Sequence, residues 1–171
     1  RKHWGEAFAT IRDILGGHAP TTSEAGHDQL IGWLDGADCQ WLRLTSERPA
    51  LHSIFLECGS WTRVPWMDAV HHHRFNLHGA GYSVRFEGGL GRAAHGIHSD
   101  EYLACEMLAG HSLMVDAGSW GAPAVRKYWL MQDVIRSLAR RDLVAHAFDG
   151  ARRDRQRIAW DNGAVVHVNQ G

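Results

Sequence analysis

The chain has 171 residues, enough for one average domain or for one domain and part of a second. Hydrophobic residues make up 44% of it and eight are Trp, so material for a core is ample. A formal net charge of −1 and a sequence pI of about 7.0 exclude the basic field that attracts nucleic acid. No apolar run approaches the ~18 residues of a membrane span, so we expect neither a nucleic acid nor a membrane as partner.

Both ends of the sequence look cut, because no initiator Met precedes Arg1 and the last residues read as a strand without a partner. We therefore expect an internal piece of a longer protein. It carries no signal peptide, and an extracellular or periplasmic location is one option for the full-length protein. The three cysteines, Cys39, Cys58 and Cys105, form no CxxC pair, which disfavours a zinc knuckle and a disulfide framework.

The first part of the chain predicts a helix, a strand and a short second helix. Gly16-Gly17 is typical of a helix end, and residues Ala19–Ser23 after it are extended. Residues 28–35 predict the short helix, and residues 38–63 fit a strand or a helix equally well. The apolar residues that recur on one face of the first helix are Trp4, Phe8, Ile11 and Leu15.

The middle of the chain predicts a buried strand, a long loop, a helix and another strand. Arg63–Val70, "RVPWMDAV", has the apolar texture of a buried strand. The Gly- and His-rich stretch after it predicts a long loop, which in a compact domain is usually functional or disordered. Ser99 is typical of the N-cap of a helix that stops at Gly110, and Ser112–Val115 predicts a strand.

The last part of the chain changes from a helical to a period-2 pattern. Residues 122–141 are the clearest helix, with Pro123 near its start. Three period-2 runs follow, and Asp161-Asn162-Gly163 between the last two indicates a tight hairpin. The pattern predicts parallel β/α units in residues 1–141 and an antiparallel sheet in residues 142–171, with a domain boundary between them.

Polar residues follow each of the three predicted parallel strands. In parallel β/α folds, functional side chains collect at the carboxyl ends of the strands, so we expect these groups to open onto one face. The residues concerned are Glu24, His27, Asp28, Asp68, His71, His72, His73 and Asp116.

Simpler roles stay open for the acidic residues. Glu24 can be an acid in the first turn of a helix, where the helix dipole favours it. Asp28 can cap the short helix that it begins. Asp116 can shape a turn before Ala-Gly, and Asp35 and Asp38 are typical turn residues beside a glycine.

The three consecutive histidines, His71 to His73, also suggest a metal site. In a strand, His71 and His73 would share one face. A third ligand would come from His78, His95, His98 or Asp116. No HExxH spacing supports this site, and sugar pockets also use His as a hydrogen-bonding group, so we expect no metal and no cofactor. The sequence also lacks a GxSxG elbow and the glycine spacing of a phosphate cradle.

Four stretches carry a resemblance to a known family. They are "EAFATIRDIL…APTTSEAGHDQLIGWLDGAD", "RVPWMDAVHHH", "ACEMLAGHSLMVD" and "RQRIAWDNGAVVHVNQG". Together they resemble the C-terminal half of large (β/α)8-barrel glycoside hydrolases, and most nearly the endo-α-N-acetylgalactosaminidase-like barrels and their uncharacterised relatives. The likeness is spread over most of the chain, and no single motif is diagnostic. It implies an α/β fold: the last three or so β/α units of a partial (β/α)8 (TIM) barrel, then the start of an antiparallel β-sandwich.

The resemblance also implies a mechanism. Ala19–Glu24 looks like the sixth barrel strand, Val64–Val70 like the seventh and Ser112–Asp116 like the eighth. Glu24 then matches the acid/base of related retaining barrels, whose nucleophilic carboxylate on the fourth strand would lie upstream of this sequence. The substrate would be a carbohydrate. The residues expected to bind it are His27, Asp28, Trp33, Asp68, His71, His72 and Asp116.

Trp33, Trp61 and Trp66 are candidates for stacking against sugar faces, with a core position as the alternative for each. Two departures from the family are the short helix after Glu24 and the long His-rich loop.

Two other functions stay open. One is a barrel that binds carbohydrate or acts as a scaffold but has lost its chemistry, and the other is a His-rich metal-dependent hydrolase. As an isolated piece, the chain would expose apolar faces and strand edges meant for missing neighbours. We therefore expect it to self-associate through those edges when it is expressed alone.

Overall fold

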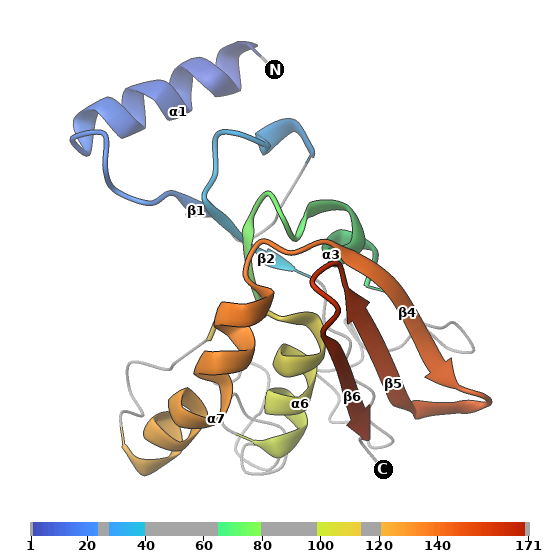
Figure 1. The fold of residues 1–171 in the computed structure, drawn as a ribbon. Helices are drawn as coiled ribbons and strands as arrows, with labels where there is room; N and C mark the ends of the chain where they lie inside the picture. The colour runs from blue at the N-terminus through green and yellow to red at the C-terminus, as the bar shows by residue number, and fades with distance from the viewer. Residues whose placement is uncertain (1, 24–27, 40–64, 80–98, 114–120, 170–171) are drawn as a thin grey trace, which may run out of the picture.

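A computed structural model describes residues 2–23, 28–39, 65–79, 99–113 and 121–169 (Figure 1). In chain order its elements are α1 (Lys2–Ile14), β1 (Thr22–Ser23), the 3-10 helix η1 (Asp28–Leu30), β2 (Gly36–Cys39), α3 (Trp66–His71), β3 (Asn76–Gly79), α6 (Asp100–Ala109), α7 (Ala122–Leu138), β4 (Leu143–Asp149), β5 (Arg152–Trp160) and β6 (Val165–Asn169). None of the described helices is both long and apolar enough to cross a membrane.

The first sheet is parallel, as predicted, and its strands lie side by side in the order β1, β2, β3. Ser112 adds a fourth parallel segment, because it forms a bridge with His78 and its N–H donates to the carbonyl oxygen of Leu77 at 2.8 Å. Gly36 allows β2 to approach β3, since a Cβ there would lie 2.8 Å from the carbonyl oxygen of Asn76.

The prediction of a strand over residues 63–70 is wrong. Residues Trp66–His71 form helix α3, which Pro65 precedes and in which the Ala69 N–H donates to the Pro65 carbonyl oxygen. The strand comes later, at β3, within the stretch predicted to be a loop. Buried Phe75 and Leu77 alternate there with an exposed Asn76, a period-2 pattern too short to stand out among the surrounding His and Gly residues.

The prediction for residues 28–39 also needs correction. Only η1 is helical among residues 28–35, and Gly36–Cys39 forms strand β2 where turn residues were predicted. Ala37 is fully buried between its neighbours in the sheet. The described residues therefore hold four parallel segments, one more than the three strands predicted from the sequence.

The parallel sheet has its own small core. Buried apolar side chains from β2, α3 and β3 form it, and Phe8 of α1 packs against them. Helix α1 also covers Trp33, whose ring would lie 2.6 Å from a Cβ at Gly5. The buried members of this core are Leu34, Ala37, Met67, Phe75 and Leu77.

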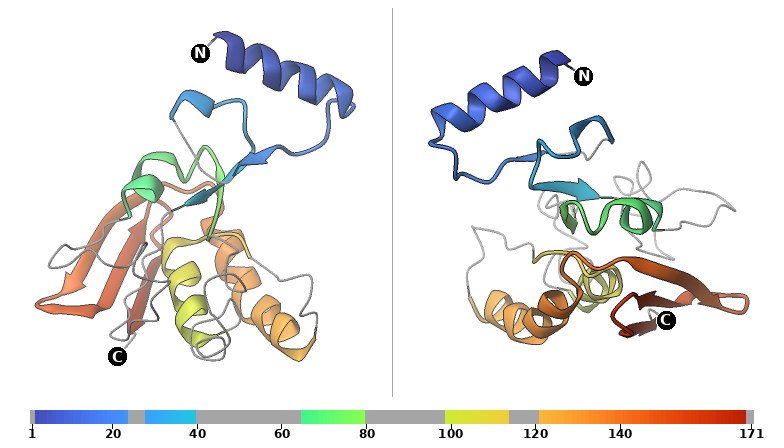
Figure 2. Two further views of the ribbon diagram at one scale, coloured as in Figure 1. Left: turned by 180° about the vertical axis from the view of Figure 1, so that it is seen from behind. Right: turned by 45° about the horizontal axis from the view of Figure 1, so that its top comes forward.

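The predicted antiparallel tail is confirmed as the sheet β4–β5–β6, with a hairpin between β5 and β6. Gly163 closes that hairpin with a φ of +84°, which glycine adopts readily, and its N–H donates to the carbonyl oxygen of Trp160. Figures 1 and 2 show α6 and α7 side by side, with this sheet next to α6.

Helices, and not a second sheet, cover the apolar face of the antiparallel sheet in the described part of the chain. Ile158 and Trp160 of β5 are buried against Leu108 and Ala109 of α6 and against Leu138 of α7. Alternate residues of β5 point to the other face, so the sheet has one apolar face, and α6 and α7 occupy it. The predicted β-sandwich is therefore not seen among the described residues.

A buried ion pair joins helices α6 and α7. The Lys127 Nζ atom of α7 lies 2.6 Å from Glu106 Oε2 of α6, and the two side chains are only 1% and 2% exposed. Burial lowers the pKa of Lys127, while the negative charge of Glu106 opposes that shift. Removing one partner from such a pair is costly, because the remaining charge stays in a site of low polarity.

This pair gives a stability prediction. Lys127→Met removes the cation that faces Glu106 and should lower the free energy of unfolding by about 3–5 kcal/mol. The double variant Glu106→Leu/Lys127→Met leaves no charge behind and should recover most of that loss. Urea denaturation of both proteins measures the difference, and a single variant as stable as the double one would contradict this role.

Candidate functional site

The candidate site lies where the parallel segments end. All four run in the same direction, so their carboxyl ends lie at one edge of the sheet. In parallel α/β folds, ligands bind at this edge. Glu24 is the next residue after β1, and His27 and Asp116 also follow strand ends closely in the sequence. These three residues lie outside the described part of the chain.

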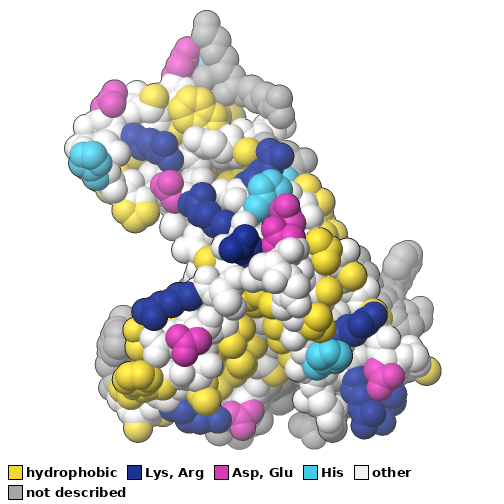
Figure 3. Space-filling model, in the orientation of Figure 1, with side chains coloured by type: hydrophobic (Ala, Val, Ile, Leu, Met, Phe, Trp, Pro, Cys, Tyr) yellow, Lys and Arg dark blue, Asp and Glu magenta, His cyan; other side chains and the backbone are white. Residues whose placement is uncertain are grey.

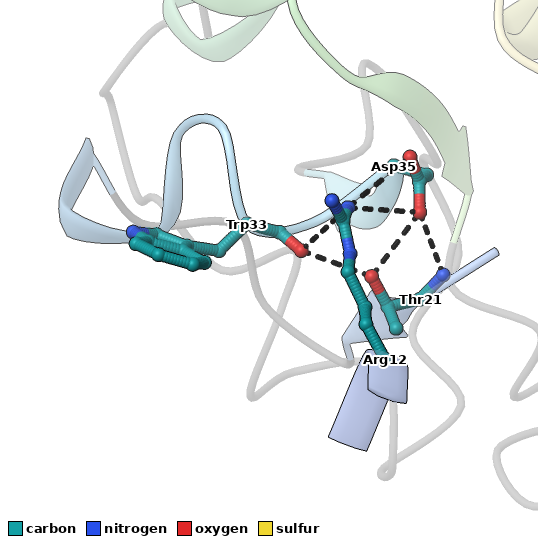
Figure 4. A network of polar contacts seen from close by, with 4 residues as sticks. All are labelled: Arg12, Thr21, Trp33 and Asp35. Carbon is teal, nitrogen blue, oxygen red and sulfur yellow. Dashed lines mark hydrogen bonds and ion pairs between the residues drawn. The ribbon is translucent and has the colours of Figure 1, made fainter. Parts of the chain in front are cut away.

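The opposite edge of the sheet is held by a polar network (Figure 4). Asp35, directly before β2, accepts hydrogen bonds through Oδ2 from the Thr21 backbone N–H at 2.8 Å and from the Thr21 hydroxyl at 3.1 Å. Thr21 is the residue before β1, so the network joins the starts of two neighbouring strands. The Thr21 backbone hydrogen bond is the main cause of a lowered pKa for Asp35.

Arg12 ties helix α1 into the same network. Its Nη2 donates to the carbonyl oxygen of Trp33 at 3.0 Å and lies 3.4 Å from Asp35 Oδ2. No sequence pattern predicts this contact, because Arg12 is typical of a basic residue in the last turn of a helix. The network therefore holds α1 and the starts of β1 and β2 together, at the amino ends of the two strands.

A buried acid and histidine form a second polar contact. Asp68 of α3 and His111, the residue before Ser112, are 2.6 Å apart between Oδ1 and Nε2. Their side chains are 1% and 4% exposed. The pair therefore joins α3 to the start of the fourth parallel segment.

His72 joins three segments that are distant in sequence. Its Nδ1 lies 2.9 Å from the carbonyl oxygen of Arg141 and its Nε2 lies 3.2 Å from that of Gly110. Its ring centroid is 4.5 Å from that of Trp160. Burial lowers the pKa of His72, and the Gly110 carbonyl and the charge of Asp68 oppose that shift.

The expectation that Asp68, His71 and His72 share a face with Glu24 rested on a strand that the structure does not contain, and Glu24 itself lies outside the described residues. The expectation required a strand that ended before His71, but residues 66–71 are helical and the strand begins only at Asn76. The three residues thus precede β3, whereas Glu24 follows β1. His71 is buried with its ring edge-on to Phe75, and His73 lies 2.8 Å from Asp142.

The remaining predicted site residues have mixed positions. Trp33 is half-buried and packs under α1, while Trp66 is 50% exposed on α3. Asp28 begins η1, and Trp61 lies outside the described residues. Within the described ranges, no three His, Cys, Asp or Glu side chains are arranged to hold a metal ion.

Comparisons with known proteins add a structural likeness. No family model matches the chain, and the search of curated proteins gives no significant match. Two solved structures of the α-N-acetylgalactosaminidase NagBb from Bifidobacterium bifidum are similar to it. A quadruple mutant has 16% identity and a TM-score of 0.61, and a ligand-free form has 19% identity and a TM-score of 0.60.

That likeness concerns the fold. It covers 99% of this chain in both cases, but only 24% and 25% of the two solved chains, so this chain spans about a quarter of their length. Almost the whole chain is thus similar in fold to part of a larger glycosidase. At this identity the match shows the arrangement of the elements and not their chemistry.

The lowered pKa of His72 predicts a pH dependence of stability. The unfolded chain binds a proton at His72 more readily than the folded chain does. The stabilisation is therefore fully present above about pH 6.5, the ordinary pKa of His, and is lost as the pH falls through the lower folded-state pKa. We expect the melting temperature to fall between pH 7 and pH 5.

Thermal melts of two variants isolate this contribution. His72→Gln removes the titrating group, so its melting temperature should change less between pH 7 and pH 5 than that of the parent. His18→Gln, at an exposed histidine, serves as the control and should keep the parent's pH dependence. An equal pH dependence in all three proteins would show that His72 is not the group responsible.

Proposed function

We propose that the chain is part of a (β/α)8-barrel glycoside hydrolase and that the whole enzyme hydrolyses glycosidic bonds of a carbohydrate substrate. The observation that supports this most is the likeness of 99% of the chain to an α-N-acetylgalactosaminidase fold. The parallel order of β1, β2, β3 and Ser112 is also what consecutive barrel strands require. Carbohydrate is the only partner in this proposal.

In this proposal Glu24 is the proton donor. Glycosidic bond cleavage needs one carboxylic acid that protonates the leaving oxygen and one carboxylate that acts as nucleophile or activates a water. Burial and a charged neighbour raise the pKa of the donor so that it holds its proton near neutral pH. The second carboxylate would come from upstream of this sequence. His27 and Asp116, which also follow strand ends, would contact the sugar.

The number of parallel segments makes a second acidic residue, besides Glu24, a candidate for the proton donor. If Ser112 belongs to the eighth strand, then β3 is the seventh, β2 the sixth and β1 the fifth. The sixth-strand position that the family resemblance gives to the acid/base would then fall on β2, which contains Asp38. Glu24 and Asp38 are therefore the two acids to compare.

The test uses the longer protein and two aryl N-acetylgalactosaminides. Glu24→Gln should lower kcat by about 10²- to 10⁴-fold on a substrate with a poor leaving group. The loss should be much smaller with a nitrophenyl leaving group, because a good leaving group needs no proton. Asp38→Asn tests the other acid, and Asp35→Asn is the control from the opposite edge of the sheet.

Each outcome of this test has a defined meaning. Unchanged turnover in Glu24→Gln together with the leaving-group effect in Asp38→Asn would move the donor to β2. No hydrolysis by the parent protein, but binding of the sugar, would favour a barrel that has lost its chemistry. Loss of activity with a chelator would favour the metal-dependent hydrolase.

A further inference from the structure

The outward face of the antiparallel sheet is polar and basic. Alternate residues of β5 and β6 point away from the helices, and they are exposed. Figure 3 shows Lys or Arg, Asp or Glu, and His side chains gathered over these strands at the lower right of the view. Among the side chains that the structure describes, the polar ones on this face of β5 and β6 are Arg155, Arg157, His167 and Asn169.

Arg157 and His167 form a directly opposed pair. They are register partners on β5 and β6, and Ala147 is the partner of Arg157 on β4. The small side chain of Ala147 leaves room beside the guanidinium. An open groove of this sheet includes Arg157 and His167 in its lining, together with Arg155 and Asn169 from the same face. Asp149 and the opposite-face residues Phe148, Gln156 and Val168 complete the lining.

The basic side chains on this face differ in whether an acidic residue faces them. Arg155 lies 3.5 Å from Asp149, so a carboxylate already faces it. The side chains of Arg157 and His167, in contrast, make no hydrogen bond or ion pair with any other residue that the structure describes. These two adjacent side chains can donate hydrogen bonds and have no acceptor among the described residues. They therefore fit a ligand that supplies oxygen acceptors.

The chemistry of the pair narrows the class of ligand. A guanidinium presents parallel N–H groups that match the oxygens of a carboxylate or a sulfate ester, and charge-assisted hydrogen bonds of this kind are strong. A second sheet would need an apolar surface to pack on, whereas this face carries two arginines. The face is therefore suited to contact a solvated ligand and not a sandwich core.

We propose that Arg157 and His167 form a binding site for an anionic sugar residue, one that carries a sulfate ester or a carboxylate. The anion recognition rests on the pair itself, and the sugar rests on the proposed glycosidase function. The site lies on the antiparallel sheet, so it would hold an anionic glycan without taking part in the chemistry.

Calorimetric titration of the 171-residue chain tests the site with four probes: N-acetylgalactosamine 4-sulfate, glucuronic acid, unmodified N-acetylgalactosamine and sodium sulfate. We expect one or both anionic sugars to bind more tightly than the neutral sugar and than free sulfate. Arg157→Gln and His167→Gln should each weaken that binding by about tenfold or more, the usual value of a hydrogen bond to a charged group.

A control variant and three outcomes make the test decisive. Arg136→Gln, at an exposed arginine of α7, should leave binding unchanged. Equal affinity for the neutral sugar would overturn the anion site, and equal affinity for free sulfate would overturn the sugar. No binding, or binding that survives both substitutions at the pair, would overturn the proposal. None of these outcomes bears on hydrolysis, which the Glu24 variants test separately.

Discussion

The parallel pairing of β1, β2, β3 and Ser112 is the constraint on which the rest of the structure depends. Because all four segments run in the same direction, every segment enters the sheet at one edge and leaves it at the other. The close approach of β2 to β3 at Gly36, where a Cβ would meet the Asn76 carbonyl oxygen, is part of what makes that pairing possible. The two edges of the sheet consequently have different roles.

The amino edge serves the fold. Thr21, Asp35 and Arg12 join the strand starts to α1. The buried pair of Asp68 and His111, with His111 level with Leu77 of β3, joins α3 to the fourth segment. His72 extends these contacts to the antiparallel sheet through Trp160 and the carbonyl oxygen of Arg141. With so many polar groups engaged at this edge, the carboxyl edge is where we place the chemistry, as in other parallel α/β proteins.

The sequence was informative wherever one pattern was long. The periodicity of α1 and α7, the capping signal of α6 and the Asn-Gly hairpin each predicted the observed element. The short strands were the failures, since β2 and β3 have four residues each and depend on pairing partners that no local pattern encodes. The strand predicted over residues 63–70 is a helix from Trp66 to His71, so Asp68 and His71 lie on that helix and not after a parallel strand, whereas Glu24 directly follows β1 in the sequence.

A crystal structure of the longer protein with a bound sugar product is the most direct test of this division between the two edges. The account predicts that the sugar contacts the residues that follow β1, β2 and β3, including the side chain at position 24 or 38. A sugar bound against Thr21 or Asp35, at the amino edge, would contradict it.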